Sequence, residues 1–240
     1  MRYFVLIIIL LLSYNYIWGQ SPQKLRISQL KDNFYVYTTY KDLGGYMFPS
    51  NSMYLVTKEG VVMFDTPWDT SQCQPLFDSI SARHQSKVVM AIVTHYHDDR
   101  TAGLEFLRNA GVMTYSSKLT YELCTEFNEA RAEYIFTKDT SFSIGEYGFE
   151  TFYPGEGHTR DNLVIWFGKQ KILYGGCLVK STENKSIGNI KDANMSEWDV
   201  SIRNIIKKYP KTKYVIPGHF DWKSNQSLNH TLNLLKQHKN

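Results

Sequence analysis

The stretch Thr94-His95-Tyr96-His97-Asp98-Asp99-Arg100 decides the fold, and it directly follows the run KVVMAIV, residues 87–93. This run is apolar almost throughout and suits a strand that is buried on both faces. His95, His97 and Asp99 alternate, and alternate side chains of an extended segment point the same way. Two imidazoles and a carboxylate suit a borderline metal such as zinc. The stretch therefore predicts a metal site at the end of a buried strand, against the alternative of a polar loop with surface histidines.

Three further residues of ligand type also follow apolar strands: His158 in YPGEGHT, Cys177 in GGC and His219 in IPGH. Each is preceded by glycine, which lets the backbone bend and approach closely. Each is weak alone, because a cysteine after a strand is usually core and a histidine after a turn is usually on the surface. Four of the seven histidines at such positions favour a common site.

The rest of the chain alternates predicted strands and helices. Strands are predicted at residues 33–39, 53–57, 61–64, 87–93, 112–115, 141–144, 149–153, 163–167, 171–174 and 214–216, and helices at 69–84, 102–110, 118–130, 196–209 and 226–237. Residues 41–51 carry two glycines and a proline and predict a mobile loop or a hairpin flap. This order predicts an α+β chain of two packed sheets with helices outside.

Composition excludes several classes of protein. The chain has 240 residues and 27.9 kDa, and this length favours one domain. A net charge of +4, scattered along the chain, gives no argument for nucleic-acid binding. Three cysteines exclude a dense disulfide framework. Cys73 and Cys124 lie in predicted helices with apolar neighbours, which favours two buried free thiols, although they could also pair.

The N-terminus has the pattern of a secretory signal peptide. Arg2 supplies a positive charge, and residues 4–12 are an unbroken run of nine apolar residues. A membrane-spanning helix needs about 20 apolar residues, so a short membrane anchor is the less favoured alternative. We therefore expect residues 1–20 to be removed and residues 21–240 to form one domain that works outside the cytoplasm.

The order HxHxDR, Gly-His-Thr, Gly-Gly-Cys and Pro-Gly-His resembles the metallo-β-lactamase superfamily, more narrowly the subclass B1 enzymes of flavobacterial type. The resemblance runs from about Leu25 to the C-terminal helix. It implies an αββα sandwich of two mixed sheets, with a zinc site at one edge. Three positions distinguish subclass B1 from its relatives. Enzymes of the glyoxalase II type carry histidine at the position of Arg100 and a bridging aspartate at the position of Cys177. Enzymes of the B2 subclass carry asparagine at the position of His95.

The resemblance implies two zinc ions per chain. The first would be held by His95, His97 and His158, and the second by Asp99, Cys177 and His219. A metal-bound hydroxide would attack the β-lactam carbonyl of penicillins, cephalosporins and carbapenems without an acyl-enzyme, and so confer antibiotic resistance. The resemblance also implies a bacterial periplasmic enzyme. Monomer is the default expectation, with a small β-lactam substrate as the partner and no stable membrane anchor.

Other residues acquire roles from the same resemblance. Lys180 would pair with the substrate carboxylate, and Asn189 would lie near the β-lactam carbonyl. Without the resemblance, these two read as a solvated lysine and a turn-forming asparagine. Asp65 and Arg100 would support the metal ligands, with Arg100 near Cys177. The last group comes from the flap, whose apolar side chains would cover the substrate: Tyr46, Met47 and Phe48.

Two other functions compete with this prediction. One is a thiolester or lactone hydrolase of the same fold, which Arg100 and Cys177 disfavour. The other is a zinc-binding module without catalysis, which the complete set of six ligand residues, the flap and Lys180 disfavour.

Overall fold

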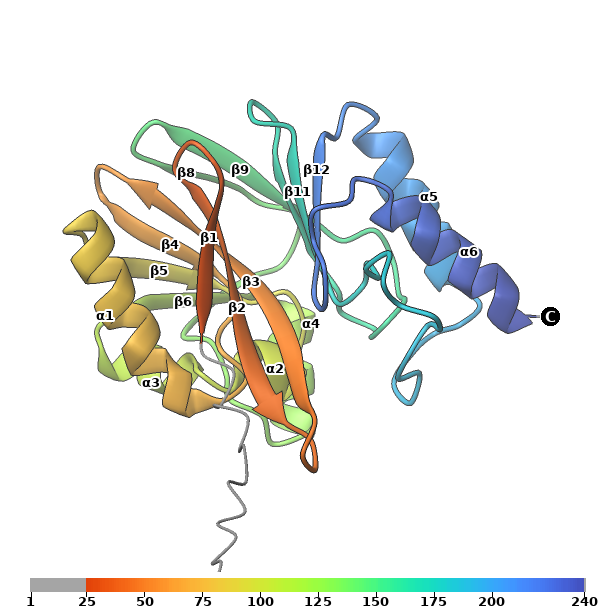
Figure 1. Cartoon of the computed structure of the whole chain (residues 1–240), viewed down its shortest axis with the longest axis horizontal. Helices are drawn as coiled ribbons and strands as arrows, with labels where there is room; N and C mark the ends of the chain where they lie inside the picture. The colour runs from red at the N-terminus through yellow and green to blue at the C-terminus, as the bar shows by residue number, and fades with distance from the viewer. Residues whose placement is uncertain (1–24, 240) are drawn as a thin grey trace, which may run out of the picture.

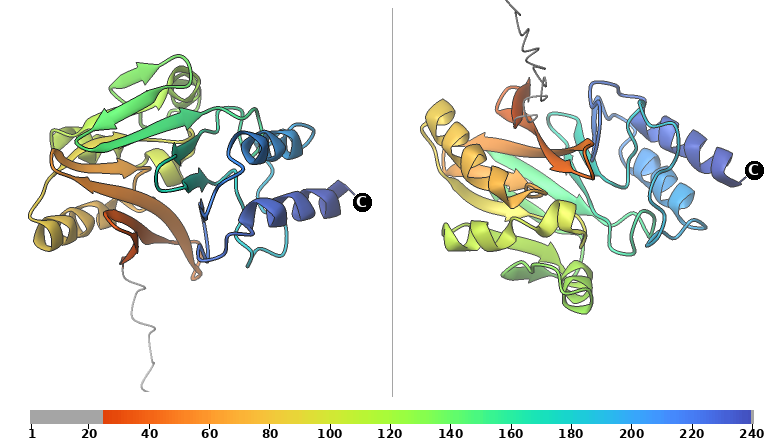
Figure 2. Two further views of the ribbon diagram at one scale, coloured as in Figure 1. Left: turned by 90° about the horizontal axis from the view of Figure 1, so that it is seen from above. Right: turned by 60° about the horizontal axis from the view of Figure 1, so that its bottom comes forward.

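A computed structural model describes residues 25–239, which form two β-sheets packed against each other with helices on the outer sides (Figure 1). The two views of Figure 2 show the helices of the N-terminal part and those of the C-terminal part on opposite sides of the sheets. The predicted signal peptide lies outside the described residues. Within them, no helix combines the length and the apolar character needed to cross a membrane.

The first sheet has seven strands in the order of the sequence. Its strands are β1 (Arg26–Lys31), β2 (Phe34–Asp42), β3 (Met47–Thr57), β4 (Gly60–Phe64), β5 (Val88–Ile92), β6 (Met113–Ser117) and β7 (Tyr134–Phe136). Pairing is antiparallel from β1 to β4 and parallel from β4 to β7. All five residues of β4 are buried, as a central strand covered on both faces requires.

The second sheet has five strands in the order β12-β11-β10-β9-β8. Its strands are β8 (Ser141–Ile144), β9 (Tyr147–Phe152), β10 (Val164–Phe167), β11 (Ile172–Gly176) and β12 (Tyr214–Pro217). β11 and β12 are parallel, and the other pairs are antiparallel. Both sheets are therefore mixed.

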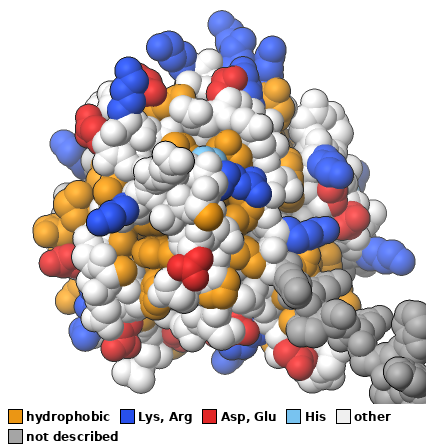
Figure 3. Space-filling view, turned by 60° about the vertical axis from the view of Figure 1, so that its left-hand side comes forward, with side chains coloured by type: hydrophobic (Ala, Val, Ile, Leu, Met, Phe, Trp, Pro, Cys, Tyr) orange, Lys and Arg blue, Asp and Glu red, His pale blue; other side chains and the backbone are white. Residues whose placement is uncertain are grey.

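The helices cover the outer faces of the sheets. They are η1 (Thr70–Gln72), α1 (Cys73–His84), α2 (Asp98–Thr101), α3 (Leu104–Asn109), α4 (Lys118–Glu126), α5 (Trp198–Lys208) and α6 (Ser227–Lys239). α1 and α3 bury Leu76, Ile80 and Leu107 against the first sheet. α5 and α6 bury residues such as Ile202 and Leu235 against the second sheet. On the side that carries α1, apolar side chains lie between charged ones (Figure 3).

The main core lies between the two sheets. Phe64 of β4 meets Phe149 of β9 and Phe167 of β10 edge-on, with both ring centroids at 5.2 Å. Burying one phenylalanine side chain contributes about 1.5–3 kcal/mol. These contacts fix the two sheets against each other and so hold the strand ends of one sheet beside those of the other.

The predicted α+β sandwich is confirmed, with local differences. The flap is a hairpin, since β2 and β3 pair from Phe34 with Leu55 to Asp42 with Met47. β1 and β7 were not predicted, because each is an edge strand without a clean apolar alternation. The predicted helix 118–130 ends at Glu126, and Asn128 has a φ of 58°. Cys73 and Cys124 are buried free thiols, as favoured from the sequence.

Candidate metal centre

Six side chains from the ends of four strands converge at one edge of the sandwich. His95, His97 and Asp99 follow β5, while the other three follow one strand each of the second sheet: His158 after β9, Cys177 after β11 and His219 after β12. Donor atoms within three overlapping trios lie within 4.8 Å of one another: His95-His158-Cys177, His95-His97-Asp99 and Asp99-Cys177-His219. The sequence prediction that these residues share one site therefore agrees with their placement.

The histidine group consists of His95, His97 and His158. Their ring centroids are 4.9, 5.0 and 5.1 Å apart. Nε2 of His95 and Nδ1 of His158 are buried and have no hydrogen-bond partner among the described residues. Burial lowers the pKa of both imidazoles, and Lys180 lowers that of His158 further. These rings are therefore neutral near pH 7 and offer unshared lone pairs, which a metal cation fits.

The cysteine group consists of Asp99, Cys177 and His219. Sγ of Cys177 lies 3.1 Å from Oδ2 of Asp99 and 3.2 Å from Nε2 of His219. Nε2 of His219 also lies 3.2 Å from Oδ2 of Asp99. A tetrahedral zinc ion with bonds of about 2.0–2.3 Å would require ligand separations of roughly 3.3–3.6 Å. Three donors of mixed S, O and N type at nearly this spacing could hold such an ion.

Arg100 supplies the positive charge that this group needs. Its guanidinium is fully buried and lies 2.9 Å from Oδ2 of Asp99 and 2.9 Å from Sγ of Cys177. Burial alone would raise the pKa of Asp99, but Arg100 together with His219 and His95 outweighs it, and the pKa falls well below its usual range. Burial raises the pKa of the Cys177 thiol, and Arg100 opposes that rise. The guanidinium therefore favours two anions side by side.

Gly218 makes this close arrangement possible. A Cβ at this position would lie 2.8 Å from each of three atoms: Nη2 of Arg100, and N and Sγ of Cys177. The Gly218 carbonyl also accepts a hydrogen bond from Nη2 of Arg100 at 2.9 Å. The glycine in the Pro-Gly-His motif is therefore required by a close approach of the backbone to the cysteine group.

Asp65 fixes the start of the metal-binding stretch. Its carboxylate accepts hydrogen bonds from the backbone N of Thr94 at 2.6 Å, from Oγ1 of Thr94 at 2.8 Å and from Oη of Tyr174 at 2.6 Å. Burial raises the pKa of Asp65 to about 6, although Arg100, whose Nη1 is 3.7 Å away, lowers it. Asp65 therefore holds the residue that precedes His95, and its expected role in supporting the metal ligands is compatible with these contacts.

Asn51 was missed by the sequence interpretation, and it ties the His219 turn to β3. Its Nδ2 donates to the carbonyls of Pro217 and Phe220 at 3.2 and 2.8 Å, and its backbone N donates to Gly218 at 2.8 Å. Its carbonyl accepts from Nη1 of Arg100 at 2.7 Å. Phe220 has a φ of 61°, so these bonds hold a strained turn in place. Local sequence does not indicate this role, because residues 41–51 predict a loop or a hairpin flap.

Asp192 was missed as well. Its Oδ2 lies 3.1 Å from Nε2 of His97, so the carboxylate can accept a hydrogen bond from this nitrogen and leave Nδ1 free as a ligand atom. Asp192 sits in the loop between β11 and α5, three residues after Asn189. Nothing in its local sequence indicates the contact, which joins residues 95 positions apart.

A cavity of about 590 Å³ opens in front of these residues. Its lining includes four of the six candidate ligands, the predicted substrate-binding residues Lys180 and Asn189, and an apolar wall: Leu43, Phe48, Trp68, Val179 and Phe220. Of the three flap residues, Phe48 lines this cavity, whereas Tyr46 and Met47 line a neighbouring hollow on the other side of the hairpin. Because Met47 and Phe48 are adjacent in β3, they point to opposite faces.

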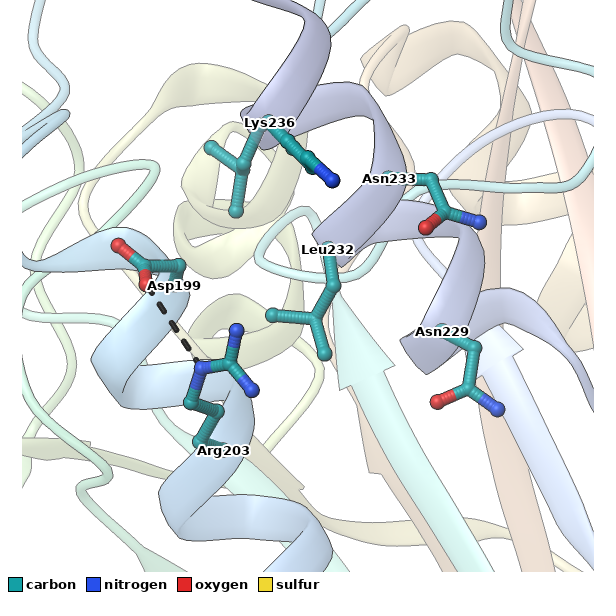
Figure 4. Close-up of a pocket in the computed structure, with 7 residues that line it drawn as sticks. Asp199, Arg203, Asn229, Leu232, Asn233 and Lys236 are labelled. Carbon is teal, nitrogen blue, oxygen red and sulfur yellow. Dashed lines mark ion pairs between the residues drawn. The ribbon is translucent and has the colours of Figure 1, made fainter. Parts of the chain in front are cut away.

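A second cavity, of about 490 Å³, lies between α5 and α6 (Figure 4). Asp199 and Arg203 form an ion pair there at 3.7 Å, and the remaining lining consists of asparagines, leucines and Lys236. It contains no histidine or cysteine. Its side chains offer no metal ligands comparable with those of the first cavity.

Comparison with known families assigns this architecture. Residues 45–219 match the profile described as Metallo-beta-lactamase superfamily. A metallo-beta-lactamase type 2 of Elizabethkingia meningoseptica is 43% identical over 222 residues, covering 92% of this chain and 89% of the relative. Metallo-beta-lactamase IND-1 of Chryseobacterium indologenes is 43% identical over 208 residues, covering 87% of each chain.

Solved structures agree with these sequence relatives. A metallo-beta-lactamase from Pontibacter korlensis superposes with a TM-score of 0.86 at 37% identity, covering 89% of this chain and 99% of its own. The crystal structure of metallo-beta-lactamase IND-7 gives a TM-score of 0.85 at 43% identity, with coverage of 88% and 98%.

Proposed function

The chain belongs to the metallo-β-lactamase superfamily and is of the B1 type, and from that premise we propose that it is a zinc-dependent β-lactam hydrolase. The substrates are penicillins, cephalosporins and carbapenems, and their hydrolysis confers antibiotic resistance. The observation that carries this proposal is the convergence of six metal-ligand side chains beside one cavity, which four of them line together with Lys180 and Asn189.

The six residues would hold two zinc ions, one in the histidine group and one in the cysteine group. The unpartnered nitrogens of His95 and His158 support the first assignment, and the mutual spacing of Asp99, Cys177 and His219 supports the second. When bound, zinc supplies Lewis acidity and a nucleophile derived from water at neutral pH. Asp99 and Cys177 contribute negative charge that Arg100 balances.

The chain's own residues bind and orient the substrate. Lys180 places a positive charge at the cavity wall, where it pairs with the carboxylate of the antibiotic. Asn189 uses its Oδ1 to accept a hydrogen bond from the backbone N of Lys191 at 3.0 Å, which leaves Nδ2 to donate to the β-lactam carbonyl. The ring of Phe48, 5.1 Å from that of His219, covers apolar groups of the substrate.

The cellular setting follows from the same proposal. An N-terminal signal peptide, residues 1–20, would direct residues 21–240 to the periplasm as one monomeric domain. In that compartment the enzyme meets β-lactams before they reach their targets.

Hydrolysis of imipenem by the purified protein tests the proposed function. We expect turnover with added zinc, loss of turnover with a chelator, and recovery when zinc is restored. Ultraviolet absorbance of the intact carbapenem measures each step. Full activity after stringent removal of metal contradicts the proposal, and stoichiometric zinc binding without hydrolysis of any β-lactam favours a binding module instead.

A further inference from the structure

The ammonium of Lys180 is held in an unusual setting for a lysine. Only 8% of the residue is exposed, although it lines the cavity of the candidate metal centre. Within residues 25–239, no carboxylate lies within ion-pairing distance of its Nζ. The aromatic face of Trp198 lies beside it instead, with Nζ 5.2 Å from the ring centroid. Indole offers the most favourable aromatic face for a cation, and the attraction grows as water is excluded.

Trp198 is itself rigidly placed. It is fully buried at the start of α5, and its Nε1 donates a hydrogen bond to the carbonyl of Leu178 at 2.9 Å. On its other side, a Cβ at Gly157 would lie 3.0 Å from Cδ1 of the indole. Its ring also lies 5.7 Å from that of His158. The indole therefore cannot turn away from Lys180 without breaking packing in the helix–sheet layer.

The main chain of Lys180 is fixed from another helix. Its backbone N donates to Oγ1 of Thr231 in α6 at 2.8 Å, and Oγ1 of Thr231 in turn donates to the carbonyl of Ser227. The backbone is thus held by α6 and the side chain by α5. Both ends of the lysine are positioned before any substrate arrives.

We propose that Trp198 is a positioning residue for recognition of the substrate carboxylate, and this inference rests on the proposed function. The aromatic face orients the Lys180 ammonium without neutralising it, because an indole carries no net charge. A carboxylate in the same place would hold the ammonium equally well but would cancel the charge that the substrate needs. The preorganised charge lowers the entropy cost of binding an anionic group.

The test compares benzylpenicillin with its methyl ester, which lacks the free carboxylate. The readout is the ratio of kcat/KM for the acid to kcat/KM for the ester. We expect the wild type to favour the acid, and Trp198→Leu to reduce the ratio roughly fivefold to thirtyfold, mainly through KM for the acid. Trp198→Phe, which keeps an aromatic face and is the variant more certain to fold, should lose a smaller part of the ratio.

Two controls separate positioning from general damage. Trp166→Leu removes an indole from the same helix–sheet layer, where Trp166 stacks on Tyr209 with centroids 4.7 Å apart, and should leave the ratio unchanged. In a Lys180→Met background, Trp198→Leu should have no further effect on the ratio. Isothermal titration of the metal-free protein with the acid and the ester gives the same comparison without turnover.

Two results overturn the inference. The first is an equal loss of kcat/KM for the acid and the ester in the Trp198 variants. The second is an acid-to-ester ratio that stays unchanged in the Trp198 variants but falls in Lys180→Met. If the wild type hydrolyses neither compound, the proposed function itself fails, and the inference falls with it.

Discussion

The histidine group and the cysteine group lie side by side at one edge of the sandwich, but they are built by opposite means. In the first, burial lowers the pKa of His95 and His158, and each of these two rings has one buried nitrogen without a hydrogen-bond partner among the described residues. The second places a carboxylate and a thiol against the buried guanidinium of Arg100. The histidine group can therefore accept a cation without a change in its own charge. The cysteine group depends on the fixed positive charge of Arg100 and on the loss of the Cys177 thiol proton.

Arg100→Met should have the largest effect, because it removes the fixed positive charge on which the cysteine group depends. The change leaves Asp99 and the carbonyls of Asn51 and Gly218 buried without their partner. We expect the metal-free protein to lose about 3–5 kcal/mol of unfolding free energy, measured by urea denaturation. Arg160→Met is the matched control, because Arg160 is half exposed and its pair with Glu126 should be worth no more than about 0.5 kcal/mol. Equal stability of the two variants contradicts this account.

Replacing the thiol tests the cysteine group alone. Cys177→Ser substitutes a hydroxyl that does not ionise near neutral pH, so affinity for the second zinc should fall on the order of a hundredfold or more, while the first ion stays bound. Zinc content after dialysis against a graded chelator measures the loss. Cys124→Ser changes a buried thiol outside the site and should keep both ions. Two tightly bound ions and an unaltered rate in Cys177→Ser would mean that the ligand assignment is wrong.

The two groups should also respond differently to pH. The Cys177 thiol has a raised pKa and stays protonated in the metal-free protein between pH 6 and 8, so zinc must displace its proton. Affinity for the second ion should then rise about tenfold per pH unit. Burial lowers the pKa of His95 and His158, so zinc displaces no proton from these two rings, and affinity for the first ion should change much less with pH. Competition titrations at several pH values measure how the affinity for each ion changes with pH. Equal slopes for the two ions would contradict the proposed difference between the two groups.

A milder substitution tests how the histidine group is held. Asp192→Asn keeps the shape of the side chain but weakens its hold on the His97 imidazole. Affinity for the first ion should fall about tenfold, with the second ion less affected. Asp221→Asn, in the loop after His219, provides the control, because its carboxylate accepts from the backbone N of Lys223 and touches no histidine. A larger loss at the second ion would reverse the assignment of Asp192.

The strand ends could be predicted because each ligand-type residue follows an apolar run within a few positions. Alternation along β3 could also have separated Met47 from Phe48, since adjacent strand residues face opposite ways. Asn51, Asp192 and Trp198 could not be identified, because their partners lie more than a dozen residues away and are set by how the sheets and loops pack. Local pattern thus located the candidate ligands but not the groups that hold them.

The β2–β3 hairpin divides two tasks along one strand. At its base, Pro49 accepts a hydrogen bond from Nδ1 of His219 at 2.8 Å, and Asn51 fixes the same turn. At its tip, Gly44 and Gly45 have positive φ values that disfavour other residues, whereas Leu43 and Tyr46 are 48% and 56% exposed. Selection for activity on new antibiotics can therefore change these exposed side chains while the base stays constant. Substrate range can evolve in this chain without any change to the metal ligands.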